Sequence, residues 1–192
     1  MVRKYRDSFK DWNLYHKGVA AFITALVVSV LYHGYVVYGG AFEFKREQVI
    51  EAPVAEVWSF VTDNENRVRW QGELTLVNGL SFEEGRSRML YWQRVYRRWR
   101  AWEETTELVQ ERVFRTRQEA DHEVRWWSVE LEPITPCQTK VVIRDVIRPN
   151  AYKDRFWFFR ESDAQEKRMD VSIGALERWT AGKDAKQKSC QS

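Results

Sequence analysis

The longest apolar run of the chain lies near the N-terminus, between Gly18 and Gly40, and contains no Asp, Glu, Lys or Arg. As an α-helix, residues 18–40 would extend about 34 Å, which exceeds the roughly 30 Å hydrocarbon core of a bilayer. Tyr32, Tyr35 and Tyr38 gather toward the end of the run, where aromatic rings favour the lipid–water boundary. This pattern predicts a single transmembrane helix.

Apolar positions then change period along the chain. Alternation around Phe42 and Phe44 predicts a half-buried strand that runs to about Ile50. Two short helices are expected next, one after Pro53 with apolar residues three and four apart, and one over residues 64–70. We therefore expect a strand followed by two short helices.

From residue 74 the period becomes two. Apolar residues on both sides of Asn78-Gly79, at 74–76 and 80–82, predict a tight hairpin. Further strands are indicated by alternation around residues 89–92 and by the runs 99–108, 112–117, 123–132 and 139–148. Met169, Ile173 and Leu176 return to helical spacing. The fold class is therefore α+β, with an antiparallel meander and a long C-terminal helix.

Three local motifs resemble those of the START-like superfamily, also called the SRPBCC, polyketide cyclase/dehydrase or Bet v 1-like group. They are the run 49–58 (VIEAPVAEVW), the segment 63–70, and residues 131–142 with Leu131-Glu132-Pro133. The likeness covers roughly residues 42–179. It implies a helix-grip fold, in which a curved antiparallel sheet of six or seven strands surrounds a C-terminal helix and encloses an apolar cavity. Members bind lipids, sterols, quinones, polyketides or plant hormones, and a minority are enzymes.

The charge distribution predicts a topology. The net charge of +3 lies entirely before residue 41, because the remaining residues carry equal numbers of acidic and basic side chains. The positive-inside bias places residues 1–17 in the cytoplasm and residues 41–181 on the opposite, periplasmic side, followed by a polar tail over 182–192. A cleaved signal peptide ending at Gly39-Gly40-Ala41 is the alternative, but the apolar run is longer than such peptides use.

Composition narrows the function classes. An apolar fraction of 44% with 15% aromatic residues excludes a disordered protein. A mean hydropathy of −0.60 excludes a polytopic membrane protein. The absence of excess positive charge on the predicted domain argues against a nucleic-acid partner. Cys137 and Cys190 show no metal or disulfide spacing and are interpreted as unrelated thiols.

Alternation and helical spacing select the side chains that would line the cavity or pack as core around it. They are Leu90, Trp92, Trp102, Phe114, Trp127, Val129 and Ile143 on strands, and Met169 and Ile173 on the C-terminal helix. A curved sheet over one helix does not fill its interior as completely as two flat layers do. Both interpretations, plain core and ligand-binding wall, remain open for each residue.

Charged positions form two further candidates. Asp145 shares a face with Ile143 and Ile147, so it would point inward as a polar cavity group and pair with Arg88, Arg125 or another cation. The arginine cluster at 94, 97, 98 and 100 is followed by an acidic run at 103, 104 and 107. We interpret this succession as a solvated strand edge whose charges compensate each other.

Arg155, Phe156, Trp157, Phe158, Phe159 and Arg160 form the most unusual local feature. Four consecutive aromatic residues bounded by arginines match neither the helical nor the strand period. They would either pack beneath the C-terminal helix or form a lip that contacts the bilayer and gates the cavity.

Catalytic signatures are sparse. His122 is the only histidine of the predicted domain, and no nucleophile elbow, phosphate loop, zinc motif or dinucleotide fingerprint occurs. No metal or cofactor is therefore expected, and binding is favoured over catalysis.

Three functional hypotheses follow. The first is a single-pass, membrane-anchored binding or transfer protein for a hydrophobic ligand such as a lipid, an acyl chain or a quinone. The second is an accessory subunit of a larger membrane complex. The third is an enzyme of the polyketide cyclase/aromatase type that uses Asp145. The expected partners are the bilayer, a hydrophobic small molecule and, under the second hypothesis, other subunits.

Overall fold

The computed structural model describes residues 14–38, 40–79, 83–94 and 97–181 of the chain. The chain divides between Gly39 and Gly40 into two units, which are described separately. Most of the predicted cytoplasmic flank, the predicted tail 182–192, and the hairpin residues Leu80 and Phe82 lie outside the described residues.

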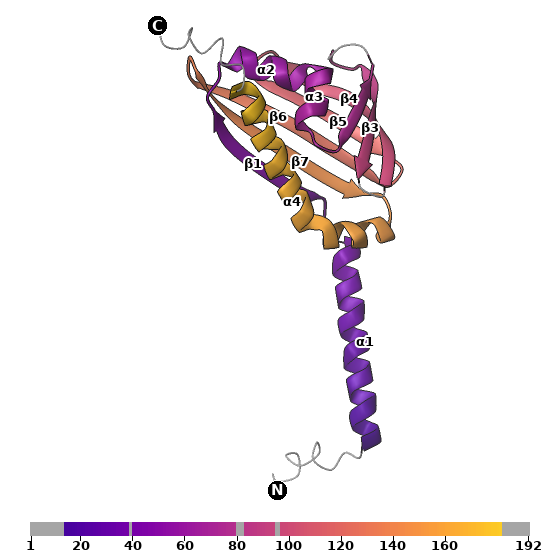
Figure 1. The fold of residues 1–192 in the computed structure, drawn as a ribbon. Helices are drawn as coiled ribbons and strands as arrows, with labels where there is room; N and C mark the ends of the chain where they lie inside the picture. Colours follow the sequence, from indigo (N-terminus) through magenta and orange to yellow (C-terminus); the bar gives the residue numbers. More distant parts are fainter. Residues whose placement is uncertain (1–13, 39, 80–82, 95–96, 182–192) are drawn as a thin grey trace. The chain divides into compact units, whose positions relative to one another are not determined.

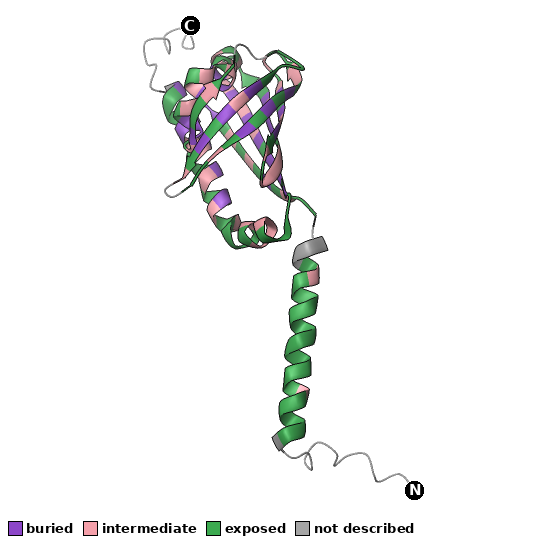
Figure 2. Cartoon of the chain, turned by 90° about the vertical axis from the view of Figure 1, so that its right-hand side faces the viewer, coloured by how far each residue is buried: buried purple, intermediate pink, exposed green. Residues whose placement is uncertain are grey.

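The N-terminal unit contains one helix, α1 (Leu14–Tyr38). Its stretch from Tyr15 to Tyr35 is long and apolar enough to cross a membrane. Its described side chains are almost all exposed, as the green ribbon of Figure 2 shows. The helix is therefore not a buried core helix of the structure. The helix begins before Gly18 and thus includes Lys17 within its first turns.

The second unit combines a sheet and three helices. Its elements in chain order are β1 (Phe42–Ile50), α2 (Val54–Thr62), α3 (Asn64–Trp70), β2 (Leu74–Asn78), β3 (Ser87–Arg94), β4 (Arg97–Val109), β5 (Val113–Ala120), β6 (Glu123–Thr135), β7 (Gln138–Pro149) and α4 (Tyr152–Ala181). The predicted strand at 42–50 and the predicted helix at 64–70 are confirmed with their bounds. Asp63 caps α3, because its Oδ1 accepts a hydrogen bond of 2.8 Å from the Asn66 N–H.

All seven strands form one antiparallel sheet in the order β1-β7-β6-β5-β4-β3-β2. The pairing of β1 with β7 joins residues about one hundred positions apart, with Phe42 opposite Ile147. Figure 1 shows the sheet curving around α4, which crosses its inner face. The α+β helix-grip fold expected from the sequence is therefore confirmed.

The connection between β2 and β3 differs from the predicted hairpin. Asn78 lies opposite Met89, so β2 pairs with β3 (Ser87–Arg94), while residues 80–82 of the predicted hairpin lie outside the described residues. The Glu84-Gly85 turn belongs to the same connection, and Gly85 adopts a φ of 75°. The predicted Glu84-Gly85 turn therefore lies just before β3.

The C-terminal helix begins earlier than its apolar spacing indicated. α4 spans 30 residues and includes the aromatic run 155–160. Figure 1 shows that its first turns, coloured orange, run in a different direction from the rest. The expectation that this run packs beneath the helix is corrected, because the run is part of the helix itself.

The interior contains two hydrophobic clusters. The larger one joins β1, α2, α3, β5, β6, β7 and α4 and includes Phe60, Phe114 and Leu176. The smaller one contains Leu74, Leu90, Trp92 and Ala101 from β2, β3 and β4. Between these clusters the inner face of the sheet carries polar side chains and a cavity.

Candidate functional site

A cavity of about 280 Å³ lies between the inner face of the sheet and α4. Its wall combines apolar and polar side chains from the α3–β2 segment, four strands and the helix. The lining residues are Trp70, Gln71, Gly72, Glu73, Trp92, Gln118, Arg125, Trp127, Ile143, Gln165, Lys167, Arg168, Met169, Val171 and Ser172. Its volume is just below the range for small-molecule sites, which is about 300–1,000 Å³.

Four of the nine side chains selected from the sequence line this cavity: Trp92, Trp127, Ile143 and Met169. Leu90, Phe114, Val129 and Ile173 are buried but belong to the packed clusters and not to the cavity wall. The structure thus divides the candidates into wall and plain core, a division that alternation alone left open.

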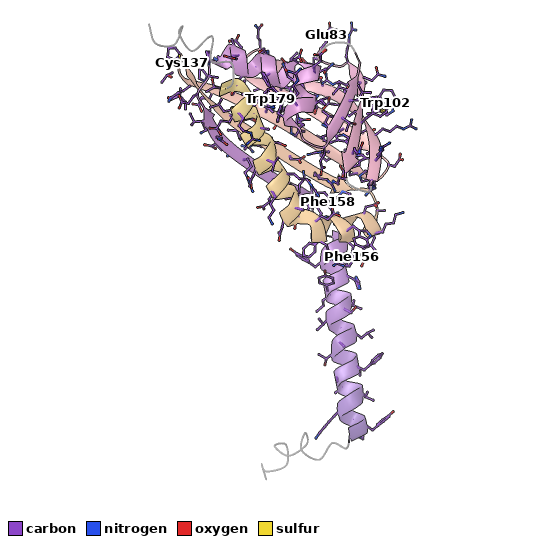
Figure 3. All side chains as sticks on the ribbon, viewed as in Figure 1. Glu83, Trp102, Cys137, Phe156, Phe158 and Trp179 are labelled. Atoms are coloured by element: carbon purple, nitrogen blue, oxygen red, sulfur yellow. The ribbon has the colours of Figure 1, made fainter. Side chains whose placement is uncertain are left out.

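Trp102 is the candidate that the structure does not place inside. Its side chain is 57% exposed, and Figure 3 shows it on the outside of the sheet. Ala101, Glu103 and Thr105 point inward instead, with Ala101 opposite the buried Leu90. The sequence interpretation was wrong here because alternation shows which residues of a strand share a face but not which of the two faces points inward.

Asp145 is fully buried and pairs with Arg125. Arg125 Nε donates to Oδ1 over 2.5 Å, and its Nη2 donates to Oδ2. Gln165 of α4 donates a further hydrogen bond of 2.9 Å to Oδ2. Asp145 does not line the cavity, whereas Arg125 and Gln165 do. Because both oxygens are engaged, the carboxylate holds Arg125 in place rather than facing a substrate.

The surroundings of this pair affect a neighbouring carboxyl group. Burial raises the pKa of Glu123 above its ordinary value, the positive charge of Arg125 opposes this, and the negative charge of Asp145 adds to it. Burial alone would lower the pKa of Arg125, but the nearby Asp145 raises it. The guanidinium therefore stays charged at the cavity wall.

Four charged side chains form an ionic ring beside the cavity, and two of them, Glu73 and Arg168, line it. Glu73 bonds both Arg94 and Arg168, each over 2.9 Å. Glu161 bonds Arg94 over 2.8 Å and Arg168 over 3.7 Å. This ionic ring joins α4 to β3 and to the loop before β2. Its members are partly exposed, so it is a rim that water reaches and not part of the core.

A second buried charge network was missed by the sequence analysis. Glu103 accepts two hydrogen bonds from Arg67, of 2.8 and 3.0 Å, and is also bonded by Arg88 and, over 2.9 Å, by Gln118. Arg67 and Glu103 have fully buried side chains. Two guanidinium groups thus share one carboxylate in the interior.

Two guanidinium groups share only one carboxylate, and the electron-rich faces of aromatic rings partly balance the remaining positive charge. The Arg67 guanidinium lies 5.6 Å from the Phe114 ring and 5.2 Å from the Trp127 ring, and that of Arg88 lies 5.7 Å from Phe114. Burial alone would raise the pKa of Glu103, but the charges of Arg67 and Arg88 outweigh this and lower it to about 2.

This network corrects the interpretation of the acidic run. Glu103 was expected at a solvated strand edge, yet it is buried because Arg88 lies directly opposite it on β3. The signal that could have found it is the inward alternation of Arg88 with Leu90 and Trp92, which demands a buried counter-charge on the neighbouring strand.

The aromatic run at the start of α4 is partly packed and partly exposed. Phe158 lies 4.8 Å from Phe42 and 6.1 Å from Phe44, measured between ring centroids. Trp157 and Phe159 are 59% and 37% exposed. Phe156 and Phe158 are labelled in Figure 3 on these first turns. The run therefore attaches α4 to β1 while presenting other rings to the surroundings.

Cys137, in the turn between β6 and β7, is disulfide-bonded. Its interpretation as an unrelated thiol is therefore wrong. The other cysteine of the chain, Cys190, lies outside the described residues.

Comparison with known proteins supports the fold and goes no further. No protein-family model and no curated protein sequence matches the chain. Among solved structures, a START superfamily protein from Mycobacterium smegmatis aligns with a TM-score of 0.59 and 15% identity, over 74% of this chain and 99% of that one. The protein TTHA0849 from Thermus thermophilus aligns with a TM-score of 0.62 and 17% identity, over 73% and 98%.

The Bet v 1-like protein Ara h 8.0201 also aligns, with a TM-score of 0.56 and 9% identity, over 74% of this chain and 99% of that one. These TM-scores establish a shared architecture, and identities this low do not establish a shared ligand. Residues 40–181 therefore have the helix-grip fold of START and Bet v 1-like proteins.

Proposed function

We propose that this protein is a membrane-anchored binding or transfer protein for a small hydrophobic ligand. The main support is the wall of the 280 Å³ cavity. It includes three indole rings, those of Trp70, Trp92 and Trp127, together with Ile143 and Met169. Flat aromatic walls suit ring systems and acyl chains, which lose contact with water on entry.

The cavity volume bounds the ligand. It suits one ring system or part of an acyl chain rather than a complete membrane lipid. Burial of about 200 Å² of apolar ligand surface contributes about 5 kcal/mol at 25 cal/mol per Å². Binding of this kind is reversible, which suits a carrier or a sensor.

Helix α1 supports the membrane anchor, and the charges before it support the orientation. Arg3, Lys4, Arg6, Lys10 and Lys17 precede the apolar run, so the N-terminus is proposed to stay cytoplasmic and the domain to be periplasmic. The disulfide bond at Cys137 is consistent with this placement, because such bonds persist mainly in oxidising compartments.

The exposed rings of α4 are proposed to contact the bilayer. Trp157 and Phe159 are exposed beside Arg155 and Arg160, and both residue types favour the headgroup region. Movement of these first turns would act on the ionic ring through Glu161 and so open the cavity.

Native mass spectrometry of the full chain extracted from cells, followed by lipid extraction, tests the proposal. The expected result is one apolar molecule bound per chain. Ser172→Trp adds a ring to the cavity wall and should remove that molecule. Ser87→Trp makes the same change at an exposed position of β3 outside the cavity and should retain it.

The proposal fails if the parent chain carries no ligand, or if both tryptophan variants retain it equally. Orientation is tested separately by protease protection in intact cells. Digestion of the domain after the outer membrane is permeabilised, with the inner membrane intact, supports the periplasmic placement. Protection of the domain until the inner membrane is lysed contradicts it.

A further inference from the structure

A guanidinium group of the cavity wall is fixed in place but only partly used. Asp145 accepts hydrogen bonds from Nε and Nη2 of Arg125, and the guanidinium carbon lies 5.3 Å from the centre of the Trp92 ring. Nη1 of Arg125 donates no hydrogen bond to any described residue, and Arg125 lines the cavity. The N–H groups of Nη1 are therefore available to an acceptor that enters the cavity.

Two further donors belong to residues of the same wall. Gln71 is 6% exposed, and its Oε1 accepts a hydrogen bond of 3.5 Å from Arg67, while its Nε2 has no acceptor among the described residues. The indole N–H of Trp70 is buried and also lacks an acceptor within the described part of the chain. Unpaired buried donors cost free energy, so a ligand that matches this wall supplies an acceptor.

The charges behind the wall favour an acceptor that is negatively charged. Among the described residues, three guanidinium groups, of Arg67, Arg88 and Arg125, share two fully buried carboxylates, of Glu103 and Asp145. Guanidinium groups stay charged in proteins, so one positive charge of this interior set has no carboxylate partner. An isolated charge is costly in a region of low polarity, and an anion in the cavity reduces that cost.

The neighbouring charged groups do not cancel this excess. Glu123 lines a separate hollow together with Arg94 and Arg97, and burial raises its pKa, which favours the neutral form. The ionic ring contains two carboxylates and two guanidinium groups and is neutral as a unit. Lys167, exposed in the cavity wall, adds a positive charge.

We propose that the ligand is a small planar carboxylic acid, whose ring lies against the indole rings of the cavity and whose carboxylate accepts hydrogen bonds from Nη1 of Arg125. This inference rests on the proposed function and specifies the ligand class of the same site. Hydrogen bonds between two charged groups are about twice as strong as neutral ones. The volume of 280 Å³ limits the acid to a compact ring system and excludes a long acyl chain.

The test is isothermal titration calorimetry of the full chain in phosphatidylcholine nanodiscs, with empty nanodiscs as the blank. Three probes of similar shape are used: 2-naphthoate, 2-naphthamide and 2-methylnaphthalene. They carry an ionised acceptor, a neutral acceptor and no acceptor, respectively. The expected affinities at pH 7 fall in that order, with roughly a tenfold difference between naphthoate and methylnaphthalene.

The double variant Arg125→Gln/Asp145→Asn replaces both members of the buried pair, so neither charge is left alone in the interior. It should lower the affinity for naphthoate roughly tenfold and leave that for methylnaphthalene unchanged. The matched control, Arg46→Gln/Asp170→Asn, makes the same changes in a pair at the surface that does not line the cavity. It should bind all three probes as the parent does.

The inference is overturned if the parent binds naphthoate and methylnaphthalene equally, or if the two double variants change naphthoate affinity equally. If the Arg125 double variant loses every probe, the order of affinities in the parent decides. Binding of methylnaphthalene without a preference for naphthoate leaves the proposed function standing. Absence of binding by all three probes overturns the carboxylic acid, whereas the proposed function fails only if native mass spectrometry also finds no bound molecule.

Discussion

Two buried ion-pair clusters lie on the inner face of the same sheet and differ in what surrounds them. Around Glu103, two guanidinium groups share one carboxylate behind the rings of Phe114 and Trp127. Around Asp145, one guanidinium meets one carboxylate, and Arg125 is open to the cavity. The first cluster attaches α3 to the sheet, while the second borders the candidate binding site.

The difference teaches that burial alone does not mark a functional group. The more deeply buried and more unusual cluster, at Glu103, belongs to the packed interior, and none of its charged side chains lines the cavity, which it meets through Gln71, Gln118 and Trp127. The cluster at Asp145 borders the cavity through Arg125 and through Gln165 of α4, the helix that would move on ligand entry. Stability and binding are thus expected to separate between the two clusters.

The largest effect is expected from Glu103→Gln. Two buried guanidinium groups would lose their counter-charge, so the free energy of unfolding should fall by about 3–5 kcal/mol. Urea unfolding followed by tryptophan fluorescence measures it. Glu104→Gln, at the exposed neighbouring position, should change stability by less than about 0.5 kcal/mol. Equal effects of the two variants would contradict the structural role of the network.

Low pH should reduce the difference in unfolding free energy between the parent and Glu103→Gln. The folded-state pKa of Glu103 is lowered to about 2 from an ordinary 4.5. The stability it contributes, about 3 kcal/mol, is therefore present above pH 4.5 and is lost as pH falls toward 2. The gap between the parent and Glu103→Gln, measured by urea unfolding at pH 6 and pH 3, should narrow. A constant gap would show that the carboxylate charge is not what stabilises the network.

A smaller loss, about 2 kcal/mol, is expected from Asp145→Asn, because Arg125 borders the cavity and water can replace part of its lost partner. The control is Asp170→Asn, which breaks an exposed pair with Arg46 and should cost less than about 1 kcal/mol. Thermal unfolding of the three proteins at equal pH measures the series. A loss as large as that of Glu103→Gln would remove the contrast between the two clusters.

The smallest expected effect is a pKa change at Glu123. Asp145 raises the pKa of Glu123 and Arg125 lowers it, so Asp145→Asn should lower that pKa toward its ordinary value. Carbon NMR titration of the Glu123 carboxyl group provides the measurement. Asp163→Asn, an exposed change on α4, should leave it unaltered. A raised pKa in Asp145→Asn would contradict the arrangement around the second cluster.

Local patterns predicted the elements well where one face of the element is apolar. Residues 42–50 and 64–70 match β1 and α3, because alternation and the Asp63 cap depend on neighbours within a few positions. The pairing of β2 with β3 was not predicted, because the partner of a strand is selected by sheet register. That register brings Met89 opposite Asn78 and is set across the whole strand.

The site was predicted only in part. Trp92, Trp127, Ile143 and Met169 were selected correctly as inward residues, since the apolar face of an element must find the core. Trp102 was placed inside by alternation, but its side chain is exposed. Its strand faces the other way, since Arg88 lies opposite Glu103 and gives that charge a partner in the interior.

By itself, the sequence determined the apolar N-terminal helix, the α+β succession of elements and the asymmetry of charge, because each depends on composition or on short-range periodicity. Only the tertiary structure decided which inward residues enclose a cavity, that Glu103 is buried, and which cation pairs with the inward Asp145. These outcomes depend on side chains such as Arg67 and Gln165, which reach their partners across elements far apart in the chain. Long-range packing brings these groups together, and local sequence patterns do not predict such contacts.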